Sequence, residues 1–137
     1  MRIDSEGDLS LSKMYRLVDA NLNRLREGLR VLEDIERFIY DNQPLAERLK
    51  ELRHACRIPE YEKYLQSRDI VGDVLKATTS SEANRENMRS IQISNIKRAQ
   101  ESARVLEESL KLIDPNLAES YKQIRYRLYD IEKAILL

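Results

Sequence analysis

The hydrophobic positions in the first quarter of the chain recur with the spacing of a long amphipathic helix. Apolar residues follow one another at alternating intervals of four and three, at Leu11, Tyr15, Val18, Leu22, Leu25, Leu29 and Leu32. Residues with this spacing share one face of a helix that has 3.6 residues per turn. We therefore predict a first helix from about Ser10 to Tyr40.

Proline and cap-forming residues divide the rest of the chain. Asp41 to Pro44 supply cap residues and a proline suited to the first turn of a helix. Thr79 and Glu82 have the spacing of a capping box. The predicted helices after the first span residues 44–57, 60–66, 81–113 and 115–136, and residues 68–81 form an ordered loop.

Two long stretches of the sequence repeat each other. Residues 21–34 and 95–108 share seven identical pairs, which are Asn21/Asn95, Arg24/Arg98, Glu27/Glu101, Arg30/Arg104, Val31/Val105, Leu32/Leu106 and Glu33/Glu107. Residues 45–53 and 117–125 match at nearly the same offset, so the repeated unit is a helical hairpin that covers residues 15–57 and 89–129. Two copies favour a four-helix array with approximate two-fold symmetry, in which matched residues can meet.

The composition agrees with one all-α domain over residues 1–137. Charged residues make up 35% of the chain, whereas Gly and Pro number three each, which is typical of long, charged helices. A net charge of zero provides no global attraction to nucleic acid or to anionic membranes, and no apolar run is long enough to span a bilayer. The lone cysteine excludes an internal disulfide and fits a reducing cytoplasm. We expect a cytoplasmic protein with neither nucleic acid nor membrane as a partner.

Asn21 projects into the apolar face of the first predicted helix, where its amide needs hydrogen-bond partners. It could fix the register of packed helices, with Arg24 covering the hydrophobic seam and Gly28 allowing a neighbouring helix to approach. Alternatively, Asn21, Arg24 and their copies Asn95 and Arg98 point into a crevice that two helices share. Arginine is well suited to such a crevice, because it can clamp a phosphate with two parallel hydrogen bonds.

Three further repeated residues, Glu27, Arg30 and Glu33, lie progressively closer to solvent on the predicted helix. An exposed ladder of ion pairs explains such spacing, and we favour that interpretation for Arg30 and Glu33. Glu27 and its copy Glu101 admit a second role. A carboxylate beside Arg24 could orient the guanidinium group or help to hold a metal ion.

Few other residues are candidates for catalysis. His54, the only histidine, ends the second predicted helix, where it can interact with the helix dipole or act in catalysis. Asp69 and Asp73 belong to the central loop; they are either ordinary loop residues or ligands that bind Mg²⁺ together with substrate phosphates. The sequence contains no glycine-rich phosphate loop, dinucleotide fingerprint, zinc-ligand cluster or Ser-His-Asp order.

The sequence resembles a known family over most of its length. The similarity runs through five segments, residues 16–34, 49–54, 67–69, 73–74 and 95–108. They resemble a small helical domain linked to thiamine biosynthesis and regarded as an alternative hydroxymethylpyrimidine-phosphate kinase. That domain occurs alone or fused ahead of thiamine-phosphate synthase. The synthase barrel is missing here, so we do not expect this chain to make thiamine phosphate.

The resemblance implies transfer of a phosphoryl group from ATP to 4-amino-5-hydroxymethyl-2-methylpyrimidine phosphate, hereafter the pyrimidine phosphate. Phosphoryl transfer depends mainly on positioning and charge neutralisation, which arginines and Mg²⁺ can provide. The resemblance implies that phosphate or pyrimidine is bound by Asn21, Arg24, Arg68, Asn95 and Arg98. It implies that Mg²⁺ is bound by Glu27 or Glu101 together with Asp69 or Asp73. His54 would act as a base or as a phosphate ligand.

The missing nucleotide motif favours a second class of function. In this alternative the chain is a non-catalytic module that binds the pyrimidine phosphate and passes it to thiamine-phosphate synthase. We also expect a symmetric homodimer, the commonest closed assembly. The predicted helices are long for one small core. The exposed apolar end of a monomer would tend to associate, because it contains Ile131, Ala134, Ile135, Leu136 and Leu137.

Overall fold

The computed structural model describes residues 8–137, with side chains described for all of these except residues 8–10, 81 and 82. This part of the chain contains helices and no strand, which confirms the all-α prediction. The helical segments are α1 (Asp8–Asp34), the π-helical turn η1 (Ile35–Ile39) that continues α1, α2 (Gln43–Ala55), α3 (Tyr61–Leu65), α4 (Ser80–Ala83), α5 (Met88–Leu110) and α6 (Pro115–Leu136). None of the described helices is both long and apolar enough to cross a membrane.

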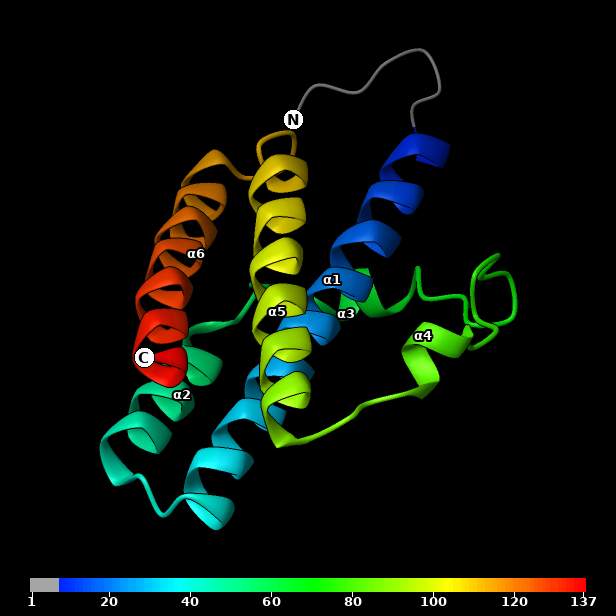
Figure 1. Cartoon of the computed structure of the whole chain (residues 1–137). Helices are drawn as coiled ribbons and strands as arrows, with labels where there is room; N and C mark the ends of the chain where they lie inside the picture. The colour runs from blue at the N-terminus through cyan, green and yellow to red at the C-terminus, as the bar shows by residue number, and fades with distance from the viewer. Residues whose placement is uncertain (1–7) are drawn as a thin grey trace.

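The two long helices α1 and α5 form the centre of the molecule. They make the most extensive helix–helix contact, and α5 crosses in front of α1 in Figure 1. Each carries its own hairpin partner, because α2 packs on α1 and α6 packs on α5. The core fills the space between these four helices with fully buried leucines and isoleucines, among them Leu25, Leu29, Leu49, Ile96, Leu106 and Leu128.

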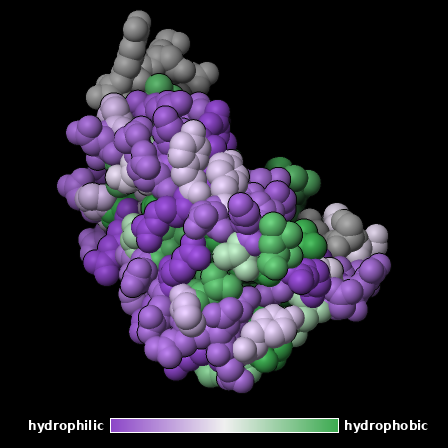
Figure 2. All heavy atoms as spheres, turned by 60° about the vertical axis from the view of Figure 1, so that its left-hand side comes forward, coloured by the Kyte–Doolittle hydropathy of each residue, from purple (hydrophilic) through white to green (hydrophobic). Residues whose placement is uncertain are grey.

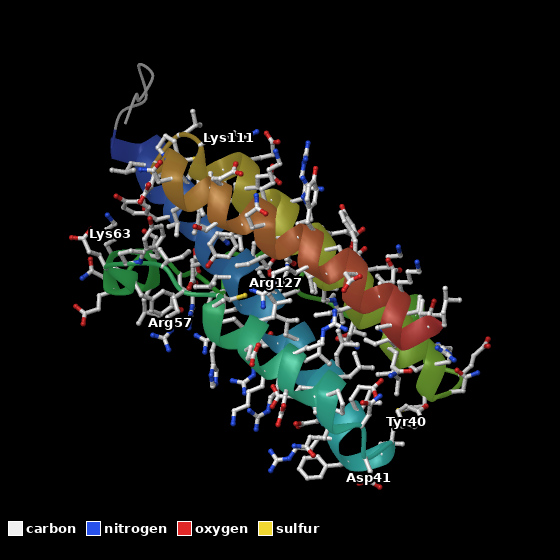
Figure 3. The ribbon with its side chains drawn as sticks, turned by 90° about the vertical axis from the view of Figure 1, so that its left-hand side faces the viewer. Tyr40, Asp41, Arg57, Lys63, Lys111 and Arg127 are labelled. Carbon is white, nitrogen blue, oxygen red and sulfur yellow. The ribbon has the colours of Figure 1, made fainter. Side chains whose placement is uncertain are left out.

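Both hairpins start their second helix with the same device. The side chain of Asn42 accepts a hydrogen bond from the backbone N–H of Leu45 at 3.2 Å, and Asp114 accepts one from Leu117 at the same distance. A proline occupies the first turn after each cap, where its missing N–H costs nothing. Figure 3 shows Tyr40 and Asp41 at the turn that leads into α2.

The helix predicted over residues 81–113 is divided in the structure. The short helix α4 ends where the side chain of Asn84 donates to the carbonyl of Ser80 at 2.6 Å. The long helix α5 then begins at Met88 rather than at residue 81, because Asn87 and Ser90 form a reciprocal capping box. The capping box that we predicted between residues 79 and 82 would lie at the start of α4. It stays a prediction, because the side chain of residue 82 is outside the described residues.

A buried ion pair joins the two helices of each hairpin. In the first hairpin, Arg53 Nε of α2 lies 2.9 Å from Glu33 Oε1 of α1. In the second, Arg125 Nε of α6 lies 2.9 Å from Glu107 Oε2 of α5. The expectation that Glu33 belongs to an exposed ladder is therefore wrong. It faces α2 and is 2% exposed, which explains why both the glutamate and its arginine are repeated. Arg30 does remain exposed and contacts Asp34 one turn later.

Figure 2 shows a mainly hydrophilic surface on the face that it draws, with hydrophobic atoms in smaller groups across the middle, at the right and at the lower edge of the view. The C-terminal residues are less exposed than their apolar character suggested, because Ile131 is buried against the core and Ile135 is partly buried. Leu137 is almost fully exposed. The homodimer remains a prediction, which light scattering at micromolar protein concentration would test.

Candidate functional site

A cleft of about 520 Å³ lies between α1 and α5, and repeated residues line it. We call it the dyad cleft. Ten of its lining residues form five pairs at the repeat offset, and Leu75 of the central loop is the eleventh. The pairs are Asn21/Asn95, Arg24/Arg98, Glu27/Glu101, Gly28/Ser102 and Val31/Val105. The structure thus brings the repeated asparagines, arginines and first glutamates into one site.

The close approach of α1 and α5 at the dyad cleft depends on Gly28. A Cβ atom built on this glycine would lie 3.3 Å from the carbonyl oxygen of Asn95 and 3.8 Å from the Cβ of Ala99. This is the tight helix contact that the sequence suggested for Gly28. α1 and α5 run in opposite directions (Figure 1), and Gly28 lies beside Asn95. The two arginines reach the cleft from different helices.

The two asparagines are buried and have equivalent hydrogen bonds. Nδ2 of Asn21 donates to the carbonyl of Leu17 at 3.0 Å, and Nδ2 of Asn95 donates to the carbonyl of Ile91 at 2.9 Å. Each bond links the amide to the preceding turn of its own helix and fixes the rotamer. The Oδ1 atoms accept no hydrogen bond from the described residues, so each can accept one from a ligand in the cleft.

The charged residues of the dyad cleft are exposed and unpaired. Arg24, Glu27, Arg98 and Glu101 form neither ion pairs nor side-chain hydrogen bonds with any residue that the structure describes. Other arginines on the same helices do have carboxylate partners; Arg104, for example, contacts Glu108 at 3.3 Å. Two arginines without partners in one cleft are free to bind an anion, since a guanidinium group donates up to five hydrogen bonds.

A second cavity of about 510 Å³, the loop cavity, adjoins the first on the side of the central loop. Asn21 and Arg24 line both cavities. The loop cavity also contains Arg68, which we expected to bind substrate. Arg68 instead holds the buried carboxylate of Asp19, with Nε at 2.7 Å from Oδ2 and Nη2 at 2.9 Å from Oδ1. Its charge is therefore already neutralised.

Asp19 was not identified from the sequence, although its place between Tyr15 and Leu22 on the apolar stripe of α1 was a usable signal. It is 2% exposed and also accepts a hydrogen bond from Tyr61 at 2.8 Å. Burial alone would raise the pKa of Asp19, but the hydrogen bonds from Arg68 and Tyr61 outweigh burial and keep that pKa below its usual value. Asp19 thus fixes the start of the central loop to α1.

The two loop aspartates that we considered as metal ligands lie in the loop cavity and organise the loop. Asp69 Oδ1 accepts a hydrogen bond from the N–H of Gly72, and Asp73 Oδ1 accepts one from the N–H of Leu75. A side chain at Gly72 would collide with the Asp69 carboxylate. No group of three or more metal-ligating side chains occurs among the described residues. A metal ion bound here would therefore need phosphate oxygens as further ligands.

His54 is exposed at the end of α2 and lines neither the dyad cleft nor the loop cavity. Its backbone carbonyl accepts a hydrogen bond from Arg57 Nε at 3.0 Å. Figure 3 shows Arg57 at the end of α2 opposite Tyr40 and Asp41. The structure thus separates His54 from the residues that we grouped with it.

Sequence comparisons identify relatives of this chain. The chain is 43% identical to thiamine-phosphate synthase of Synechocystis sp. over 93% of its length, which is 37% of that protein. It is 39% identical to thiamine-phosphate synthase of Nostoc punctiforme over 90% of its length and 35% of that protein. The chain thus spans a little over a third of these curated relatives. No solved structure matches it. The ThiD2 family matches residues 16–134, and the chain belongs to this family.

Proposed function

We propose that this protein acts in thiamine biosynthesis and that it phosphorylates the pyrimidine phosphate to the diphosphate with ATP as donor. Membership of the ThiD2 family and similarity to thiamine-phosphate synthases support the pathway. The observation that supports phosphate chemistry is the pair Arg24 and Arg98, which face one cleft from two helices without carboxylate partners among the described residues.

The dyad cleft has the groups that such an acceptor requires. The two arginines would bind and neutralise its phosphate, and the Oδ1 atoms of Asn21 and Asn95 can accept hydrogen bonds from the amino group of the pyrimidine ring. Glu27 and Glu101 are unpaired carboxylates, and one or two carboxylates together with substrate phosphates form a common Mg²⁺ site. Mg²⁺ would neutralise charge on the phosphoryl groups.

The proposed transfer balances without a general base. A terminal phosphate oxygen of the acceptor forms a bond to the γ-phosphorus of ATP, the bond from that phosphorus to the bridging oxygen breaks, and ADP leaves. A phosphate monoester is already largely deprotonated at neutral pH, because its second pKa is near 6. Catalysis therefore depends on holding two anionic groups together. This requirement suits a site with arginines and is compatible with the remote position of His54.

A non-catalytic binding module is the second candidate. It is favoured by the lack of a nucleotide-binding motif and by the lack of a three-ligand metal cluster in the part of the chain that the structure describes. In that case the dyad cleft would bind the pyrimidine phosphate and present it to thiamine-phosphate synthase. Both candidates would use the same residues, so they differ only in whether the protein converts ATP to ADP.

An assay of ADP release separates the candidates. Purified protein with Mg²⁺, ATP and the pyrimidine phosphate should release ADP with formation of the diphosphate, and Arg98→Lys should slow this reaction at least about tenfold, because lysine keeps the charge but loses the bidentate geometry. Arg30→Lys and Arg104→Lys are matched controls, since these repeated arginines lie outside the cleft. Binding of the acceptor without acceptor-dependent ADP release would favour the binding module.

A further inference from the structure

The loop cavity breaks the two-fold symmetry of the site. It is lined by Lys13 and Arg16 of α1, whose counterparts at the repeat offset are Asn87 and Ser90. Those two residues form the capping box at the start of α5. In the first repeat the helix starts earlier, at Asp8, so Lys13 and Arg16 lie within α1. Extra cations are thus present on the Arg24 side of the dyad cleft and have no equivalent on the Arg98 side.

Three cations of the loop cavity lack a carboxylate partner. Arg68 is paired with Asp19, but Lys13, Arg16 and Arg24 form no ion pair with any described residue. Arg16 donates to the backbone carbonyl of Asp69 at 3.0 Å, which positions its guanidinium group without removing its charge. Three cations on one helix that have no ion-pair partner among the described residues are suited to several phosphoryl groups in a row.

Apolar side chains lie next to these cations. Leu17 and Ala20 of α1 and Ile70 of the loop line the same cavity. Ile70 is 73% exposed and Leu17 is 42% exposed, so both present apolar surface at the cavity. An apolar surface beside a row of cations matches a ligand with a flat base and a polyphosphate chain.

We propose that the loop cavity is the binding site of a nucleoside triphosphate and that the acceptor phosphate is held on the Arg98 side of the dyad cleft. This assignment rests on the proposed function. Lys13 and Arg16 contact the polyphosphate, and Leu17 and Ile70 cover the base. Arg24 lines both cavities and therefore lies where the transferred phosphoryl group passes from donor to acceptor.

The loop aspartates fit this assignment. Asp69 and Asp73 each have one carboxylate oxygen that accepts a backbone hydrogen bond within the loop, and the second oxygen of each accepts none from the described residues. Both aspartates line the cavity together with the cations. They can hold Mg²⁺ against the phosphates of the donor, because this ion commonly takes one or two carboxylates together with phosphate oxygens.

Calorimetric titration with two separate ligands tests the assignment. The probes are adenosine 5′-(β,γ-imido)triphosphate with Mg²⁺ and the pyrimidine phosphate. Lys13→Ala should weaken binding of the nucleotide about tenfold and leave binding of the pyrimidine phosphate unchanged. Arg98→Lys should weaken binding of the pyrimidine phosphate and leave binding of the nucleotide unchanged. Lys133→Ala, which removes an exposed cation on α6, is the control and should change neither affinity.

Ile70→Ala gives a second test that does not depend on charge. This variant should bind the nucleotide several-fold more weakly than the parent does. If Lys13→Ala and Ile70→Ala both bind the nucleotide as tightly as the parent does, the loop cavity is not its site. Acceptor-dependent ADP release by the parent would then still support the kinase. If the parent binds no nucleotide, both the assignment and the kinase are wrong, and the binding module is supported.

Discussion

The two hairpins of this protein share a framework and differ at one end. In both, a buried glutamate of the long helix meets an arginine of the short partner helix at 2.9 Å, as Glu33 with Arg53 and as Glu107 with Arg125. In both, an asparagine of the long helix donates to the carbonyl one turn earlier. These repeated contacts hold each hairpin together and shape the dyad cleft.

The difference lies on the loop side of α1. Asp19, which holds Arg68 and Tyr61 and so fixes the central loop, corresponds to Ile93 in the second hairpin. Lys13 corresponds to Asn87, a helix cap. The repeat explains a site with two equivalent halves, and the proposed donor and acceptor sites assign a different ligand to each half. Variants at matched and unmatched positions can test this division.

The largest effect should come from the matched buried ion pairs. Glu33→Ala and Glu107→Ala each leave a mostly buried arginine without its carboxylate, since Arg53 and Arg125 are 14% and 10% exposed. Each variant should lose about 3 kcal/mol of unfolding free energy. Urea denaturation of both variants beside the parent measures this loss. A large cost in one hairpin and none in the other would break the equivalence of the two halves.

A smaller effect is expected where α1 and α5 cross. Gly28→Val places branched methyl groups against the carbonyl of Asn95 and the Cβ of Ala99, so the helices must separate. We expect a loss of about 2 kcal/mol in unfolding free energy together with weaker binding of the pyrimidine phosphate. Ser102→Ala at the matched position fills no new space and should cost less than about 1 kcal/mol. Equal costs at both positions would contradict the close approach at Gly28.

The smallest effect concerns the unmatched Asp19 and depends on pH. Its pKa is lowered in the folded protein, because hydrogen bonds from Arg68 and Tyr61 outweigh burial. The charged carboxylate therefore stabilises the fold fully when the pH is above its pKa in the unfolded chain, which is about 4. This stabilisation disappears as the pH falls through the lower pKa of the folded protein.

Asp19→Asn should accordingly lower the free energy of unfolding by about 1 kcal/mol at pH 7. When the pH falls from about 5 to about 3, the free energy of unfolding should decrease less in this variant than in the parent. Thermal unfolding across this range provides the measurement. Ile93→Asn at the matched position is the control, because it should show the same acid dependence as the parent. Parallel pH profiles for the parent and Asp19→Asn would refute the role of this carboxylate.

Much of the fold followed from the sequence because local patterns determine it. The four-three spacing in α1 predicted the long helix, and the prolines at residues 44 and 115 marked the starts of the second helices. One of the two interpretations that the repeat allowed placed Asn21 and Arg24 with their copies in a crevice between helices, and these residues do line one cleft. Matched residues on two crossing helices are brought together by symmetry, which a single sequence reveals.

The parts that the sequence did not predict depend on contacts between distant elements. Glu33 lies four residues after Leu29, at the border of the apolar stripe of its own helix, so its position already indicated a buried side chain. What the stripe could not show is which arginine of α2 pairs with it. Arg68 was grouped with phosphate ligands, but its partner Asp19 lies 49 residues away and was unknown. The start of α5 was misplaced because residues 81–87 can extend a helix, and the capping box of Asn87 decided otherwise.

The central claim is that the dyad cleft binds phosphate through Arg24 and Arg98, and calorimetric titration of the pyrimidine phosphate tests it most directly. Arg24→Lys and Arg98→Lys should each weaken binding about tenfold with unchanged melting temperatures, since neither arginine has a partner among the described residues. Arg30→Lys and Arg104→Lys should bind as the parent does. Unchanged affinity with a lowered melting temperature in the first two variants would show that these arginines are structural and would contradict the account.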